Sequence, residues 1–123
     1  MAYINAEQVK AIRQKLKEKF PQFKFSVRLE HYSSVSVSIM AGPLTFEQEL
    51  GGRDHIELNH YYLSNYDNMS LFQSIVDVIK TAPASVNGGQ AWYDKSDAMI
   101  DYFDTAYYFR LSIGQWDKPY IKR

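Results

Sequence analysis

Four aspartates in the last third of the chain have the spacing most suggestive of chemistry. Steps of three, four and three residues put their carboxylates on one side of the segment if it is helical: Asp94, Asp97, Asp101 and Asp104. Such a stripe could bind a divalent cation, imitate the phosphates of a duplex or meet a basic partner. A cation requires the oxygens to converge within about 2.0 to 2.6 Å of one point, whereas a partner surface requires them to spread out. The plainer alternative is that these aspartates cap turns and face water.

The histidines are the other residues that could bind a metal. His55 and His60 are five residues apart, which fits neither the i, i+4 spacing of a helical metal pair nor the i, i+2 spacing of a strand pair. Asp54 and Glu57 are close in sequence, so a site is conceivable. We nevertheless interpret all three histidines, including His31, as ordinary loop or hydrogen-bonding residues.

Signatures of nucleophilic and phosphate-cradling chemistry do not occur in the sequence. Cysteine is absent, which excludes disulfides, thiolate nucleophiles and thiolate metal sites. No serine stands in a Gly-x-Ser-x-Gly turn, and the pairs Gly51-Gly52 and Gly88-Gly89 lack the other positions of a phosphate-binding loop. We therefore expect no catalytic residues, no metal and no cofactor, and an enzyme is the minority hypothesis.

Basic residues near the N-terminus have a clear chemical use. They form a strip if the segment is helical, and such a strip contacts phosphates while exposed tyrosines stack on bases. The alternative is a helix that is simply solvated by its lysines. The residues of the predicted nucleic-acid strip are Lys10, Arg13, Lys17 and Lys24.

The formal net charge is zero, but the charge is unevenly distributed. Residues 1–28 carry a net charge of +5, from seven basic and two acidic residues, and residues 110–123 carry +3, from four and one. The segment between them carries −8, from three basic and eleven acidic residues. Two differently charged faces would steer partners through their electric field, whereas charges paired over a solvated surface are the plainer reading.

Length and composition predict one folded domain spanning residues 1–123. The chain has 46% hydrophobic residues, and its ten tyrosines and seven phenylalanines suit a wet contact surface as well as a core. No apolar run approaches the roughly 20 residues of a membrane helix, and the first ten residues lack the apolar core of a secretion signal. We expect a cytoplasmic protein that does not bind a membrane.

Alternating apolar and polar residues predict the sheet that would position these side chains. The clearest alternation makes a hairpin of residues 23–39 with its loop at 31–34, and two further strands fall within 53–62 and 105–114. Two amphipathic helices are expected to cover the apolar face of this sheet. The fold class is therefore α+β: a two-layer sandwich with a mainly antiparallel sheet of about four strands and two helices packed on one face.

The helix boundaries are also predicted by capping patterns. The first helix spans residues 4–20, with Asn5 and Gln8 as its capping box. The second begins at Ser70, capped together with Gln73, and its apolar stripe runs to residue 79. A single helical turn is expected at 45–50, capped by Thr45 and Gln48.

Short blocks spread over nearly the whole chain resemble one known family. They are Phe25-Ser26-Val27-Arg28 with the Ser-Val alternation after it, Ala41-Gly42-Pro43, Leu58-Asn59-His60-Tyr61-Tyr62-Leu63, Ser96-Asp97, Asp101-Tyr102-Phe103, Ile113-Gly114 and Trp116-Asp117-Lys118-Pro119-Tyr120. These blocks are similar to the large polyvalent protein-associated domains of phages, plasmids and other conjugative elements. The resemblance implies a mobile-element setting, in which such domains travel with incoming DNA and protect it or help it establish. It supplies no catalytic residues.

Two functional hypotheses follow. The first is a non-enzymatic accessory protein of a mobile element that binds another protein, for example a component of host defence. The candidate partner surface for this role is acidic and rich in tyrosine: Tyr93, Asp94, Asp97, Asp101, Tyr102, Asp104 and Tyr108. The alternative is a nucleic-acid-binding module that uses the basic N-terminal helix. The sequence leaves the identity of the partner and the oligomeric state open.

Overall fold

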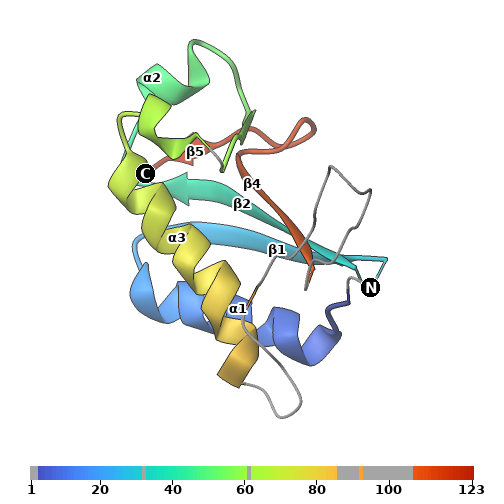
Figure 1. Ribbon diagram of the computed structural model, residues 1–123. Coiled ribbons are helices and arrows are strands. Elements are labelled where there is room, and N and C mark those ends of the chain that lie inside the picture. The colour runs from blue at the N-terminus through green and yellow to red at the C-terminus, as the bar shows by residue number, and fades with distance from the viewer. Residues whose placement is uncertain (1–2, 32, 61, 86–91, 93–106) are drawn as a thin grey trace, which may run out of the picture.

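The computed structural model describes residues 3–31, 33–60, 62–85, 92 and 107–123. Its helices and strands form two layers (Figure 1). In chain order they are α1 (Ala6–Lys19), β1 (Lys24–Glu30), β2 (Ser34–Gly42), α2 (Glu47–Leu50), β3 (Ile56–Leu58), the 3-10 helix η1 (Leu63–Asn65), α3 (Met69–Thr81), the 3-10 helix η2 (Ala82–Ser85), β4 (Tyr108–Ile113) and β5 (Ile121–Lys122).

Helix α1 begins as the sequence predicts. The side chain of Asn5 accepts a hydrogen bond from the backbone N–H of Gln8 at 2.9 Å, and the side chain of Gln8 accepts one from the backbone N–H of Asn5 at 2.8 Å. This reciprocal capping box satisfies two N–H groups that the helix itself leaves unpaired. The capping prediction is confirmed.

The predicted caps of the other two helices are wrong. Helix α2 follows Phe46, which has φ 52°, and no side chain caps it. The side chain of Gln48 instead spans to the segment before α3, where it accepts from the N–H of Asp67 at 3.1 Å. Helix α3 begins at Met69, one residue before the predicted start, and Gln73 donates to Asp77 at 3.0 Å within the helix.

The buried carboxylate of Glu49 takes over the capping of α3. Its Oε2 accepts from the backbone N–H of Asn68 at 2.9 Å and from the side-chain amide of Asn68 at 3.0 Å. A carboxylate at a helix N-terminus is also stabilised by the helix dipole. The sequence pattern misses this cap because Glu49 is 19 residues away from Asn68.

The sheet is mixed, with the strand order β1-β2-β4-β3, and β5 pairs with the end of β2. The pairs β1–β2 and β3–β4 are antiparallel, whereas β2 pairs in parallel with both β4 and β5. The α+β prediction is confirmed. The parallel pairs were not predicted, because a tight turn fixes the direction of β1 against β2 but not that of β4, which returns after β3 and α3.

Both long helices lie on one face of the sheet (Figure 1). The inward residues Val27, Val37 and Leu111 are 6%, 1% and 0% exposed, so the predicted apolar face is the buried one. Burial of such a face is the main source of stability for a two-layer domain. In the described segments, no helix combines the length and the apolar character needed to cross a bilayer.

Candidate nucleic-acid interface

Tyr108 is the one residue of the candidate partner surface that lies within the described part of the chain. This side chain is 53% exposed and lies on the outer side of β4, opposite to the helices. The other six residues of that surface, Tyr93, Asp94, Asp97, Asp101, Tyr102 and Asp104, lie outside the described residues. The acidic stripe therefore remains a prediction.

Three residues of the predicted basic strip lie on α1. Val9, Ile12 and Leu16 are buried, so the other side of the helix faces solvent. Lys10, Arg13 and Lys17 follow one another at helical spacing on that exposed side.

Arg13 ties the strip to the sheet. Its Nη2 donates to the backbone carbonyl of Val27 at 2.8 Å. Val27 belongs to β1, which lies at the edge of the sheet among the described strands. Because a guanidinium has five N–H donors, this bond orients Arg13 and leaves donors for a ligand.

The fourth residue of the strip, Lys24, opens β1 and faces the same groove as Arg13 and Lys17. The groove has a volume of about 420 Å³, and Arg123 lines it as well. The backbone N–H of Arg123 donates to the carbonyl of Gly42 at 2.8 Å, which holds the C-terminal segment against β2. Four cationic side chains thus surround one groove, and none of the described residues that line it is acidic.

Two phenylalanines and a proline also line this groove. Pro21, Phe23 and Phe25 line it beside the four cations. Phe23 is buried and Phe25 is half-buried. Arg123 was not predicted as a member of the site, although the net charge of the last fourteen residues was a signal for it.

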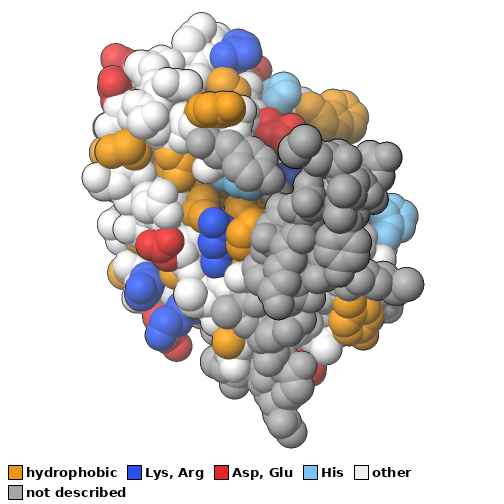
Figure 2. Space-filling model, viewed as in Figure 1, with side chains coloured by type: hydrophobic (Ala, Val, Ile, Leu, Met, Phe, Trp, Pro, Cys, Tyr) orange, Lys and Arg blue, Asp and Glu red, His pale blue; other side chains and the backbone are white. Residues whose placement is uncertain are grey.

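Over the helical face of the molecule, charges of both signs are interspersed. Figure 2 shows Lys and Arg side chains next to Asp and Glu side chains in this view. One such pair is Lys15 and Glu18, 3.9 Å apart and well exposed. The basic groove is therefore a local feature and does not reflect a positively charged helical layer.

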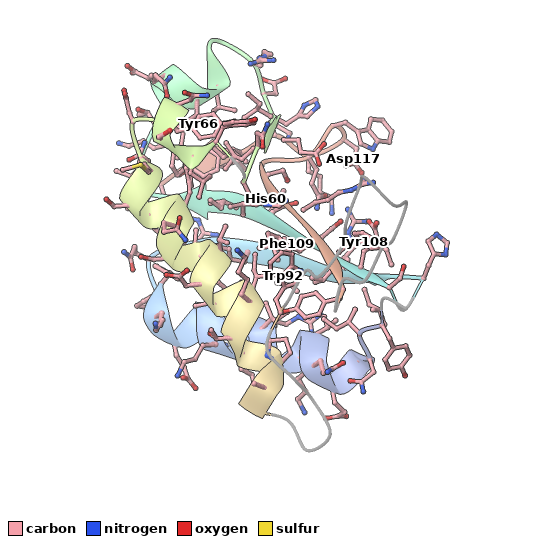
Figure 3. The ribbon with its side chains drawn as sticks, in the orientation of Figure 1. His60, Tyr66, Trp92, Tyr108, Phe109 and Asp117 are labelled. Atoms are coloured by element: carbon pink, nitrogen blue, oxygen red, sulfur yellow. The ribbon has the colours of Figure 1, made fainter. Side chains whose placement is uncertain are left out.

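The three histidines lie apart from this groove. His31 has φ 54° in the exposed hairpin loop, and His55 is exposed before β3. The ring of His60 packs 4.3 Å from that of Phe109, and burial lowers the pKa of His60, with the ammonium of Lys80 adding to the effect and Glu57 opposing it (Figure 3). Within the described parts of the chain, no three His, Cys, Asp or Glu side chains are grouped so that they could hold a metal.

The cluster around His60 has a structural explanation. The ammonium of Lys80 lies 4.5 Å from the ring centroid of Trp92, an arrangement that stabilises both groups. Trp92 also donates from Nε1 to the carbonyl of Tyr107 at 2.7 Å, and its ring packs edge-on against Phe109 (Figure 3). These contacts connect the end of α3 to β4.

The chain matches the model of a known protein family. The model of the family "large polyvalent protein associated domain 29" matches residues 3–104, which is most of the chain. The chain belongs to this family. The resemblance found in the sequence blocks is thereby confirmed, although the blocks after residue 104 lie beyond the match.

No curated protein and no solved structure matches this polyvalent protein associated domain. Its chemistry must therefore be inferred from its own side chains. In the described residues, the cationic groove offers guanidinium and ammonium donors that suit phosphate oxygens.

Proposed function

We propose that this polyvalent protein associated domain binds nucleic acid through the groove between α1 and the start of β1. The observation that supports the proposal most strongly is the convergence of Arg13, Lys17, Lys24 and Arg123 on that groove. Arg13, Lys17 and Lys24 come from α1 and the start of β1, and Arg123 comes from a distant part of the chain. Phosphates of a nucleic-acid backbone are the biological anions that such an array of separate cations fits best.

The number of cations gives the expected salt dependence. Four phosphate contacts give a slope of log K against log salt of about −3 for a single strand and about −3.6 for a duplex. Raising the salt from about 50 to 200 mM should then weaken binding by roughly 50- to 150-fold. Binding that depended on base contacts alone would be much less sensitive.

Charge-matched variants test the groove. The double variant Lys17→Gln/Lys24→Gln removes two groove cations, and Lys15→Gln/Lys19→Gln removes two from the other side of α1. Fluorescence anisotropy with a labelled oligonucleotide should show weaker binding and a slope smaller by about 1.4 to 1.8 for the first variant. The second variant should bind almost as well as the parent protein. Equal losses in both variants would mean that only net charge matters, and the groove would not be the site.

A second candidate function is protein binding through the acidic and tyrosine-rich surface. It is supported by the exposed phenol of Tyr108, because interfaces favour tyrosine. A pull-down from a host lysate should recover a partner with the parent protein and lose it with Asp97→Asn/Asp101→Asn. Equal recovery with both proteins would count against this function.

A further inference from the structure

We infer that the nucleic acid is single-stranded and that it continues from the groove across the open face of the sheet, where Trp116 stacks on a base and Arg28 and Arg110 contact phosphates. This inference rests on the proposed function and assigns its ligand class and a second part of the site.

The register places two arginines on either side of a serine. Arg28 of β1 pairs with Ser36 of β2, and Ser36 pairs with Arg110 of β4. Neighbouring strands are about 4.8 Å apart, so the two arginine Cα atoms are separated by roughly 10 Å. Because serine is short, a hollow remains between the two exposed arginine side chains. It has a volume of about 240 Å³.

The floor of this hollow is a row of serines. Ser38 and Ser112 share a hydrogen bond of 2.8 Å between their hydroxyls. The side-chain amide of Gln115 donates to Ser26 at 3.3 Å and to Ser38 at 3.4 Å. Gln115 thus anchors the chain that leaves β4 against the sheet face.

This anchor holds Trp116 beside the hollow. Gln115 and Lys118 exchange two backbone hydrogen bonds, at 2.8 and 3.1 Å, so that Trp116 and Asp117 form a tight turn (Asp117 in Figure 3). Trp116 lines the hollow and is 84% exposed. An indole left in water forgoes the gain from burial. A base stacked on the indole would supply the missing contact.

Cations connect the groove to this hollow. Ser26 and Arg28 alternate with the inward residue Val27 and face the outer side of β1, whereas Lys24 stands at the start of the strand, before the register shift between Lys24 and Phe25. Lys24 also lines the groove, and Arg28 lines the hollow. A phosphate backbone can therefore pass from α1 onto the sheet without leaving cationic side chains.

Two carboxylates on the same face do not oppose this path strongly. Glu30 accepts a hydrogen bond from the hydroxyl of Ser36 at 2.9 Å. Glu57 lies 4.0 Å from Nε of Arg110, and both side chains are about two-thirds exposed. An ion pair in water at this distance is weak, so a phosphate can replace Glu57 as the partner of Arg110.

The ligand is single-stranded because stacking on Trp116 requires a free base. In a duplex the faces of the bases are occupied by neighbouring base pairs, whereas an unpaired strand can splay its bases onto aromatic side chains. An open sheet face with an aromatic side chain at its end suits that mode of binding.

The test is fluorescence anisotropy with labelled oligonucleotides of about 20 residues, a length that spans a site of this size. Oligo-dT, oligo-rU and a DNA duplex are compared for the parent protein, for Trp116→Leu and for Trp116→Phe. Trp116→Leu should weaken single-strand binding by roughly 5- to 150-fold. Trp116→Phe should retain most of it, because a phenyl ring still stacks. Tyr62→Leu, which removes another exposed aromatic side chain, is the matched control and should bind like the parent protein.

The outcomes separate this inference from the proposed function. Stronger binding of either single strand than of the duplex, lost in Trp116→Leu, supports the inference, and the tighter of the two single strands names the ligand as DNA or RNA. If duplex and single strands bind equally well, and Trp116→Leu binds like the parent protein, the inference is overturned and the groove remains the proposed binding site. No binding of any oligonucleotide at about 50 mM salt overturns both. Because Trp116 is exposed, its variants should fold like the parent protein, and circular dichroism of each variant checks this directly.

Discussion

Replacing Phe46 by alanine and by glycine tests two physical effects at one position. Phe46 is 2% exposed, and its ring packs 5.7 Å from that of Phe72 and 5.0 Å from that of Tyr120. Its backbone has φ 52°, in the left-handed region that residues with a Cβ rarely adopt. Packing therefore favours the phenylalanine, and the backbone favours glycine.

The magnitudes follow from these two features. Loss of a buried phenylalanine costs about 3 to 5 kcal/mol of unfolding free energy, and the ring pairs place Phe46→Ala in the upper half of that range. A Cβ in the left-handed region costs about 1 to 2 kcal/mol, while glycine loses about 0.5 to 1 kcal/mol more conformational entropy than alanine. Phe46→Gly should therefore be more stable than Phe46→Ala by about 0.5 to 1 kcal/mol.

Urea unfolding followed by circular dichroism measures both variants. Gln14 supplies the control, because it is exposed in the middle of α1. There the order should reverse, with Gln14→Gly about 1 kcal/mol less stable than Gln14→Ala. A loss below about 1 kcal/mol in Phe46→Ala would refute the packing argument. A Phe46→Gly variant less stable than Phe46→Ala would refute the backbone argument.

Three further outcomes are expected. Gly114→Ala should lower the free energy of unfolding by about 2 kcal/mol or more in urea. Gly114 has φ 70°, and a Cβ there would lie 2.8 Å from backbone atoms of two other segments. A variant as stable as the parent protein would contradict this. Glu49→Gln keeps an acceptor for Asn68 but loses the negative charge, so it should lower the free energy of unfolding by about 1 kcal/mol. Glu49→Ala should lower it further, because it leaves the N–H of Asn68 unpaired. Equal stabilities of the two variants would argue against the cap. The pKa of His60 is lowered in the folded protein. The contribution of His60 to stability is therefore complete above its unfolded pKa of about 6.5 and is lost as the pH falls toward the folded pKa. The difference in unfolding free energy between pH 7 and pH 5 should be smaller in His60→Gln than in the parent protein.

The sequence predicts the parts of the fold that depend on local patterns. Alternation identifies which side of Val27, Val37 and Leu111 is buried, and the capping box identifies the start of α1. Both are readable because side chains two, three or four residues apart decide them. The family was recognised for a similar reason, since its blocks are contiguous in sequence.

The remaining features depend on residues that are distant in the chain. Alternation gives the face of β4 but not its neighbour, so the parallel pairing with β2 could not be predicted. Glu49 caps a helix that begins 20 residues later, and its role is visible only after folding. The same holds for Arg123, which joins the predicted strip of Lys10, Arg13, Lys17 and Lys24 because its backbone binds the end of β2.

The most direct measurement of nucleic-acid binding is the salt dependence of the affinity of the parent protein for a single-stranded oligonucleotide. The slope of log K against log salt should be about −3 if the four groove cations alone contact phosphates. It should approach about −4 if Arg28 and Arg110 contribute as well. A slope near zero, or no binding at about 50 mM salt, would contradict a site built from these cations.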